Sequence, residues 1–465
     1  MFVLLSTSHS NIWGQDTDIL QRCEQDTILR DLNIPLLEIW TKDGVEPTAR
    51  NVDAPSGLWG TSVVDNEYVY ARMAISLKDS VLYDSGVDGM KIRLRGNTSN
   101  LWGKKPYKLK LSKKRDLLFR GIQYEDKDWV LKAVYDGLIT RVYTGLEVGR
   151  QVGLDWSPGC RLVNLVINGN YKGDYLLFEI VEREQHRVKV EKSGYIIEDD
   201  AYWWNEDVYF KSNVLPRQVG YTFKYPDPEN VNDRIIENIR SYIWDFEVAL
   251  LEGGDISRYI DIDNWAAWLL AQDILGQSDA AGTNWFLYKE DYDALSPGST
   301  LLKMGPLWDF DGAFEINDKW SDIHRVEYSF YFGRLLQRED FFSSYVALWD
   351  SVRSSFSMDG LREYLNNVLD NSENGINNSR ILGSNLFYDD WYTPIEDEIE
   401  FAIDWMSDRI KWIDEQLKYE TSIEIVEGDC AKSVGIYNVY GQRLPSIPRF
   451  SKGIYIIDGK KVLIK

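Results

Sequence analysis

The chain has 465 residues, enough for one large domain or two to three domains of ordinary size. Hydrophobic residues make up 44% and charged residues 27%, which excludes collagen-like, coiled-coil and wholly disordered proteins. A formal net charge of −22 argues against nucleic-acid binding, because a polyanion would be repelled. Three scattered cysteines and three histidines also disfavour a zinc site, a disulfide scaffold or a serine-hydrolase triad.

The N-terminal segment, MFVLLSTSHSNIWGQ, opens with a short apolar run. We expect residues 1–27 to be a leader, either the rear part of a truncated signal peptide or a disordered extension, and both alternatives stay open. No later segment approaches 18 consecutive apolar residues, so the sequence predicts no transmembrane segment.

From about Leu32 the pattern is short and alternating, which predicts strands of a mostly antiparallel sheet. The predicted strands are IPLLEIWT, VYARMAISL, MKIRLRG, PYKLKLS and DWVLKAV. A helix is expected between Gly137 and Gly153, because its apolar residues recur at helical spacing. Two further strands follow, RLVNLVING and YKGDYLLFEIVE, and NGNYKG between them predicts a hairpin turn.

Beyond about Asn230 the pattern changes to amphipathic helices, and the predicted ones are RIIENIRSYIWDFEVALLE, NWAAWLLAQDILGQ, FFSSYVALWDSVRSS and EIEFAIDWMSDRIKWIDEQL. A strand-rich first half and a helix-rich second half predict an α+β fold with two lobes and a cleft between them. The last forty or so residues return to strands, GIYNVYGQRL and KGIYIIDGKKVLIK, and we expect them to form a separate small β module.

Two polar loops could carry chemistry. In QSDAAGTNWFLY, Asp279 and Asn284 have the spacing of a protein-kinase catalytic loop, although loop polar residues often only satisfy turns. In MGPLWDFDGAFE, Asp309 and Asp311 flank a phenylalanine, and such carboxylates suit Mg²⁺ with substrate phosphates. An aspartate-rich turn or a calcium site is the alternative. The order of the two loops favours phosphoryl transfer, because in kinases a metal-binding aspartate follows the catalytic loop.

These loops, together with IPLLEIWTKDG, IRLRGNTSNLWGKKPYKLKL, DWVLKAVYDGLITR and LVNLVINGNYKGDYLLFEIVE, resemble the CotH kinase family, named after spore coat protein H. The resemblance runs from about Leu32 to Arg409, and we place the domain at residues 28–420. It implies an atypical protein-kinase-like fold with a strand-rich N-lobe and a helical C-lobe. It also implies use of ATP and Mg²⁺ and phosphorylation of Ser or Thr on secreted or surface proteins.

Residue roles follow from the same resemblance. Asp279 matches the catalytic aspartate of the family and Asp309 the metal-binding one. Asn284, by its spacing, and Asp311, by its place in the acidic pair, are further candidate metal ligands.

Cofactor-binding candidates lie in the first half of the chain. Arg95, beside a glycine in the RGNTS turn, is expected to approach the phosphates. Lys108 and Lys110 alternate on one face of the next strand, so either could reach the phosphates, and the loop lysines Lys104 and Lys105 remain alternatives. Glu179 is expected on the hinge side of the nucleotide pocket, or as a structural ion-pair partner.

The tail, residues 424–465, resembles the C-terminal sorting domain of the type IX secretion system of Bacteroidetes, because the GIY, NVYGQR and KGIYII elements occur together at the chain end. This resemblance implies the export machinery as a partner and a secreted or cell-surface location. A generic β-hairpin cap is the alternative.

A second function from another class also stays open. The aromatic share of 14% fits a packed core, or a surface-displayed binding or structural protein that holds glycans or a protein partner. Exposure of Trp203 and Trp204 would favour the binding protein. Convergence of Asp279, Asn284 and Asp309 would favour the kinase.

Overall fold

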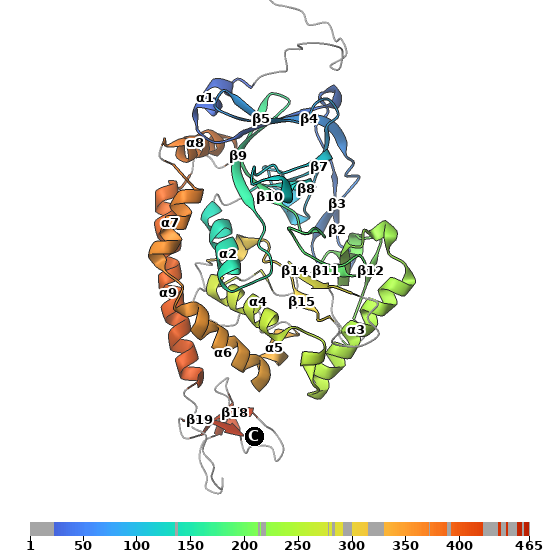
Figure 1. The fold of residues 1–465 in the computed structure, drawn as a ribbon, viewed down its shortest axis with the longest axis vertical. Coiled ribbons are helices and arrows are strands. Elements are labelled where there is room, and N and C mark those ends of the chain that lie inside the picture. The colour runs from blue at the N-terminus through green and yellow to red at the C-terminus, as the bar shows by residue number, and fades with distance from the viewer. Residues whose placement is uncertain are drawn as a thin grey trace, which may run out of the picture.

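The computed structural model describes residues 23–134, 138–212, 214, 220–277, 279–280, 284–291, 300–314, 330–371, 373–387 and 392–421, and four short strands beyond residue 435. Figure 1 shows a strand-rich N-terminal part, coloured blue to cyan, above a largely helical C-terminal part. The prediction of an α+β fold with strands before helices is confirmed.

The N-terminal part is built on one eight-stranded sheet whose first strand also pairs with the seventh in the order, so the sheet closes on itself. Adjacent strands of this sheet pair antiparallel, except β1 and β9, which run parallel. In sheet order, the strands are β1 (Leu36–Thr41), β9 (Cys160–Ile167), β10 (Asn170–Glu179), β8 (Asp126–Lys132), β7 (Tyr107–Arg115), β6 (Met90–Leu94), β4 (Val69–Leu77) and β5 (Ser80–Asp84).

Alternation along β8 explains how this sheet serves two cores. Trp129 and Leu131 are buried in the core inside the closed sheet. Val130 lies between them in sequence and packs into the other core, which the sheet shares with the helices. Because side chains alternate across a strand, Lys132 points to the same outer face as Val130.

The predicted hairpin and helix of this part are confirmed. β9 and β10 are joined by Asn168 and Gly169, both in the left-handed region with φ of 50° and 76°. The expected helix is α2 (Ile139–Gln151), whose face with Val142 and Leu146 is buried against the helical part. A small hairpin, β2 (Arg50–Asp53) and β3 (Thr61–Val64), stands apart from the large sheet.

A second sheet combines three strands that precede Asn230 with two strands from the region where the sequence predicts helices. It contains β12 (Tyr209–Phe210), β13 (Gly220–Tyr225), β11 (Tyr195–Asp200), β14 (Trp285–Lys289) and β15 (Lys303–Met304), in that order. Of these, β14 contains the apolar run WFLY, which is typical of a buried strand. Of the others, β12 and β15 have only two residues each, and β11 has three apolar residues followed by three acidic ones, so no alternation marks them in the sequence.

The four predicted helices are present as α3 (Asp233–Glu252), α4 (Ile262–Leu275), α6 (Glu339–Arg353) and α9 (Ile395–Thr421). Asn232 and Asp261 cap α3 and α4 by accepting hydrogen bonds from backbone N–H groups of the first turns. Within α4, residues 265–275 are buried on every side, so this helix forms the centre of the helical part. Shorter helices not predicted are α1 (Asp26–Asp31), α5 (Phe332–Leu335), α7 (Met358–Val368) and α8 (Gly375–Phe387).

The tail contains four short strands, β16 (Ile436–Asn438), β17 (Arg443–Leu444), β18 (Gly453–Ile457) and β19 (Lys460–Ile464), which pair antiparallel in the order β17-β16-β18-β19. The domain limits at 28–420 and 424–465 stay predictions, and most of the leader, residues 1–22, lies outside the described residues. No described helix combines the length and the apolar character needed to cross a membrane.

Candidate functional site

The loop after α4 is tied directly to the loop that carries Asp309. α4 ends at Leu275, and Gly276 after it is left-handed, with φ of 55°, and turns the chain out of the helix. Gln277 follows, buried, and its Nε2 donates a hydrogen bond to the carbonyl of Asp309 at 2.8 Å. Its Oε1 accepts from the backbone N–H of Asp279 at 3.1 Å. One amide side chain therefore holds the two loops together.

Asp279 and Asn284 meet as the predicted spacing requires. The Asn284 Nδ2 lies 3.3 Å from the Asp279 Oδ2 and 3.2 Å from its carbonyl oxygen. Asn284 is left-handed, with φ of 60°, a conformation that asparagine tolerates better than most residues. Trp285 then opens β14 with a fully buried ring, which fixes the place where the loop re-enters the fold.

Asp309 is held by a lysine from the large sheet. It follows β15, is left-handed with φ of 56°, and precedes the short 3-10 helix η7 (Phe310–Gly312). Its carboxylate forms an ion pair with Lys132 at the end of β8, and the Lys132 Nζ lies 3.5 Å from the Asp311 Oδ1. The two candidate metal-binding aspartates thus meet one cation from the N-terminal part.

Burial and charge set the protonation of this group. Burial opposes the charged form of Lys132, but the carboxylates of Asp309 and Asp311 outweigh it and raise the lysine pKa. Burial also opposes ionisation of Asp309, yet Lys132 lowers its pKa below the usual value. At Asp279, burial and the charges of Asp309 and Asp311 raise the pKa to about 6. Such a carboxylate can take a proton near neutral pH.

A close contact with α2 fixes the turn that carries both aspartates. A Cβ on Gly145 would lie 2.2 Å from the Phe310 ring, so only glycine lets the ring pack against the helix. Arg141, one turn earlier, donates a hydrogen bond from Nη1 to the Asp311 carbonyl at 2.8 Å. The position of α2 therefore determines where Asp309 and Asp311 lie.

Arg95 lies beside the same carboxylates. Its guanidinium is 5.8 Å from the Trp308 ring centroid, and it interacts electrostatically with Asp309. Gly96 after it is left-handed, with φ of 83°, and the Asn100 side chain donates to the Gly96 carbonyl at 2.7 Å. The loop expected to approach phosphates is therefore close to the aspartates.

Lys108 and Lys110 are not the lysines that meet Asp309. They lie on the outer face of β7, where Lys108 is opposite Val130 and Lys110 opposite Asp128. Both pair with Asp128, at 3.1 and 3.8 Å. The loop alternatives are also engaged: Lys104 is buried against Asp174 at 2.9 Å, and Lys105 donates to the Asn100 carbonyl. The lysine that contacts Asp309 is Lys132, which is not among the candidates predicted from the sequence, and phosphate contact by Lys108 or Lys110 stays a prediction.

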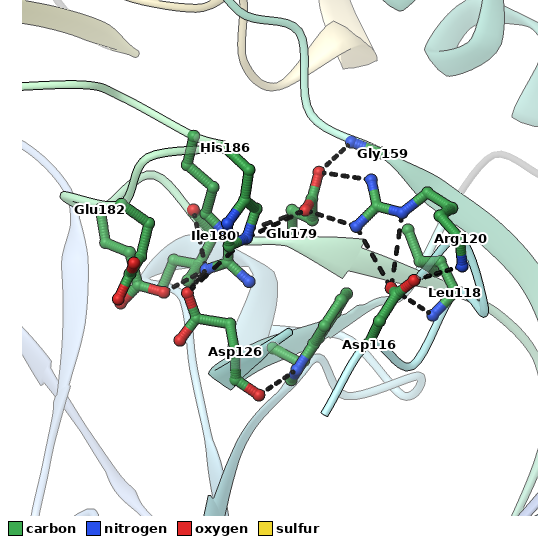
Figure 2. A network of polar contacts seen from close by, with 12 residues as sticks. Asp116, Leu118, Arg120, Asp126, Gly159, Glu179, Ile180, Glu182 and His186 are labelled. Atoms are coloured by element: carbon green, nitrogen blue, oxygen red, sulfur yellow. Dashed lines mark hydrogen bonds and ion pairs between the residues drawn. The ribbon is translucent and has the colours of Figure 1, made fainter. Parts of the chain in front are cut away.

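Glu179 belongs to a separate polar network, shown in Figure 2 with Arg120 on one side and His186 on the other. It is fully buried and accepts two hydrogen bonds from Arg120, at 2.6 and 3.1 Å, and one from the Gly159 backbone N–H at 2.7 Å. Arg120 also contacts Asp116. Both oxygens of Glu179 are occupied by protein donors, so the alternative of a structural ion-pair partner matches its surroundings.

Two residues of the site, Lys132 and Gln277, are not predicted from the sequence, and the sequence signals that mark them are weak. Lys132 ends the strand DWVLK, and a lysine that closes a buried strand within a segment carrying the family resemblance could have been singled out. Gln277 directly precedes the polar loop, but nothing in its sequence context shows that it reaches the turn 32 residues away.

The donor set at the site fits Mg²⁺. Asp309 is ionised and retains about a third of its side-chain exposure, and Asn284 and Asp311 offer further oxygens nearby. Among the described residues, no three carboxylate, imidazole or thiol side chains stand close enough to hold a metal ion alone. Such a set suits magnesium, which keeps waters and takes phosphate oxygens beside one or two protein ligands.

Comparison with known proteins adds the family. A search among curated proteins finds no match. One solved structure, titled as the HipA, HipB and operator DNA complex of the Shewanella oneidensis MR-1 toxin–antitoxin system, is 11% identical with a TM-score of 0.22. That match covers 80% of this chain and 72% of the other, and its TM-score is too low to carry an argument. The family model described as CotH kinase protein matches residues 92–413. Because this match spans most of the 465 residues, including every candidate site residue, the chain belongs to the CotH kinase family.

Proposed function

We propose that this protein transfers the γ-phosphoryl group of ATP to Ser or Thr of a protein acceptor. The observation that carries the proposal is that Lys132 pairs with Asp309, and that Gln277 ties the loop of Asp309 to the loop in which Asp279 and Asn284 contact each other. These residues come from three separate segments of the chain. Membership of a kinase family supports the same chemistry. A kinase-like arrangement of the two parts is proposed with it.

Lys132 and Arg95 are the groups proposed to bind phosphate oxygens. Lys132 is charged and already faces Asp309, so an arriving phosphate finds a cation held in place by a carboxylate. Arg95 offers forked donors and interacts electrostatically with Asp309. Asp309 and Asn284 are the residues proposed to hold Mg²⁺, which when bound would neutralise charge on the phosphate oxygens.

Asp279 is proposed as the base. The acceptor hydroxyl oxygen forms a bond to the γ-phosphorus, and the bond from that phosphorus to the bridging oxygen of ADP breaks, with its electron pair leaving on ADP. The hydroxyl proton passes to the Asp279 carboxylate. A pKa of about 6 keeps this group ionised at neutral pH while making it a stronger base than an ordinary aspartate.

Export is part of the proposal. The tail resemblance supports a secreted or cell-surface location and the export machinery as a partner, and a secreted or surface protein as the acceptor. The alternative, a non-catalytic binding protein, is favoured less, because Trp203 and Trp204 are both only half-exposed and Trp203 packs against Tyr209 at 4.7 Å.

The test is transfer of label from [γ-³²P]ATP with Mg²⁺ to dephosphorylated casein and to the protein itself. Wild type should incorporate label, and Asp279→Asn and Asp309→Asn should not. Asp359→Asn is the control, because Asp359 is 99% exposed on α7. Equal incorporation by wild type and Asp279→Asn would overturn the catalytic assignment, and no transfer together with no ATP binding would favour the non-catalytic function.

A further inference from the structure

Hydrogen bonds from two distant segments hold the loop that carries Arg95. Ser62 of β3 donates from Oγ to the Asn97 side-chain oxygen at 2.6 Å. Asn205 donates from Nδ2 to the Ser62 Oγ at 2.8 Å and to the Val63 carbonyl at 3.0 Å. The hairpin β2–β3, residues 200–206 and the loop are therefore joined in one polar chain.

A second contact joins the same three segments. The Thr98 Oγ1 and the Tyr202 hydroxyl are 2.8 Å apart. The Tyr202 ring packs on Trp59 at a centroid distance of 5.6 Å, and the Trp204 Nε1 donates to the Trp59 carbonyl at 3.3 Å. Tyr202 thus contacts the loop through its hydroxyl and the hairpin through its ring.

Tyr202 also lies near the reacting groups. Burial raises its pKa, Thr98 opposes the rise, and the charges of Asp279 and Asp309 add to it. Tyr202 therefore lies within electrostatic range of these two carboxylates.

A glycine shapes this contact. Gly60 is left-handed, with φ of 94°, and a Cβ there would lie 2.6 Å from the Tyr202 ring. Gly57, in the same hairpin, is also left-handed, with φ of 86°, but a Cβ there would meet nothing within 4 Å. Alanine would strain the backbone at both positions, but only at Gly60 would its side chain also displace Tyr202.

We propose that these contacts form a brace, made of Ser62, Asn97, Thr98, Tyr202 and Asn205, that holds the Arg95–Asn100 loop over the site before any ligand binds, with Tyr202 as its positioning residue. This inference rests on the proposed function only for the identity of the ligand, a nucleoside triphosphate. A loop ordered in advance loses less conformational entropy on binding, so the brace should strengthen nucleotide binding more than it speeds the chemical step.

The first test is hydrogen exchange of the loop amides in the protein without nucleotide. Tyr202→Phe and Thr98→Val each remove the shared hydrogen bond and should speed exchange roughly threefold to tenfold, the range that one lost hydrogen bond allows. Thr98→Ser, which keeps a hydroxyl, and Tyr209→Phe, on neighbouring β12, should behave like wild type. Loop exchange unchanged in both Tyr202→Phe and Thr98→Val would overturn the inference, whether or not the protein is a kinase.

The second test compares ATP kinetics. Tyr202→Phe and Gly60→Ala should raise KM for ATP roughly threefold to tenfold with kcat within about twofold, and Gly57→Ala should leave KM near wild type. The Tyr202→Phe/Thr98→Val double variant should be no worse than either single variant, because both remove one interaction. Lowered kcat with unchanged KM would contradict a positioning role. Absence of phosphoryl transfer in wild type would instead count against the proposed function and leave the exchange test to decide the brace.

Discussion

Two groups of charged side chains contact the large sheet, and they are built differently: Glu179 is fully buried, whereas Asp309 keeps about a third of its side-chain exposure. Around Glu179, each carboxylate oxygen accepts from protein donors, which come from Arg120 and the Gly159 backbone. Around Asp309, one lysine serves two aspartates, and both Asn284 and Asp309 adopt the left-handed conformation.

This difference indicates that the Glu179 group stabilises the fold and that the Asp309 group can bind a ligand. A carboxylate whose donors are all supplied by the fold has nothing left for a ligand, whereas a carboxylate with one protein cation and partial exposure can take another. Strained backbone and a carboxylate with a raised pKa also gather at functional sites. Both groups combine acidic and basic side chains, and two properties distinguish them: the arrangement of the donors, and burial, because Glu179 is fully buried whereas Asp309 and Asp311 are partly exposed.

The largest effect should come from Lys132→Met. Loss of the cation at the phosphates should lower kcat/KM for ATP by about 100-fold or more. Lys108→Met is the matched control, because Lys108 lies on the same outer face but pairs with Asp128, and it should change kcat/KM by less than about threefold. Similar losses in both variants would mean that the phosphates extend along β7.

Glu179→Ala should act on stability instead. Removing this carboxylate leaves the Arg120 guanidinium and the Gly159 N–H without their partner, and the free energy of unfolding in urea should fall by about 2–4 kcal/mol. Asp309→Ala should cost less, because Asp311 remains beside Lys132. A larger loss of unfolding free energy in Asp309→Ala than in Glu179→Ala would contradict the distinction between the two groups.

The pH dependence of kcat/KM sharpens the assignment of Asp279. Since the base must be ionised, kcat/KM should be half-maximal near pH 6 and should fall about tenfold for each pH unit below that value. Asn284→Ala removes a donated hydrogen bond that lowers the Asp279 pKa, so the midpoint should move up. Asp311→Asn removes a charge that raises it, so the midpoint should move down. Shifts in the same direction would contradict this electrostatic account.

The smallest effect should be a gain in stability in Asp279→Asn. The folded-state pKa of Asp279 lies above its unfolded value, so the ionised carboxylate destabilises the fold at high pH and the cost disappears as pH falls below the unfolded value. The substitution should raise the free energy of unfolding by on the order of 1 kcal/mol at pH 8, after allowance for partial exposure. Urea unfolding at pH 8 and pH 4 checks that this gain shrinks on acidification.

Local patterns predict much of the fold. Alternation identifies β4, β6, β7 and β10, and the Asn-Gly pair identifies the β9–β10 turn, because both depend on residues close in sequence. Closure of the large sheet through β1 and β4 depends on pairing between strands far apart, which no local pattern reports. Short strands such as β12 and β15 carry too few residues to show a period.

The site is predicted in part for the same reason. The loops with Asp279, Asn284 and Asp309 are recognisable from spacing and order, and the structure brings Asp279 together with Asn284. Which lysine meets Asp309 depends on the register of β7 against β8, and in that register Lys108 lies beside Val130, not beside Lys132. The partner of Glu179 lies 59 residues away, so its sequence surroundings do not reveal it.

The contact between Gly145 and Phe310 links the site to the outside of the helical part. Phe310 stands between Asp309 and Asp311 in sequence, and its ring rests on α2 with no side chain between them. α2 in turn packs on α4, α7 and α9. A molecule that tilts α2 by binding to those helices would move the Phe310 ring and change the spacing of the two carboxylates around Lys132. The absence of a single methyl group at position 145 thus makes the electrostatics of the site depend on the orientation of a helix.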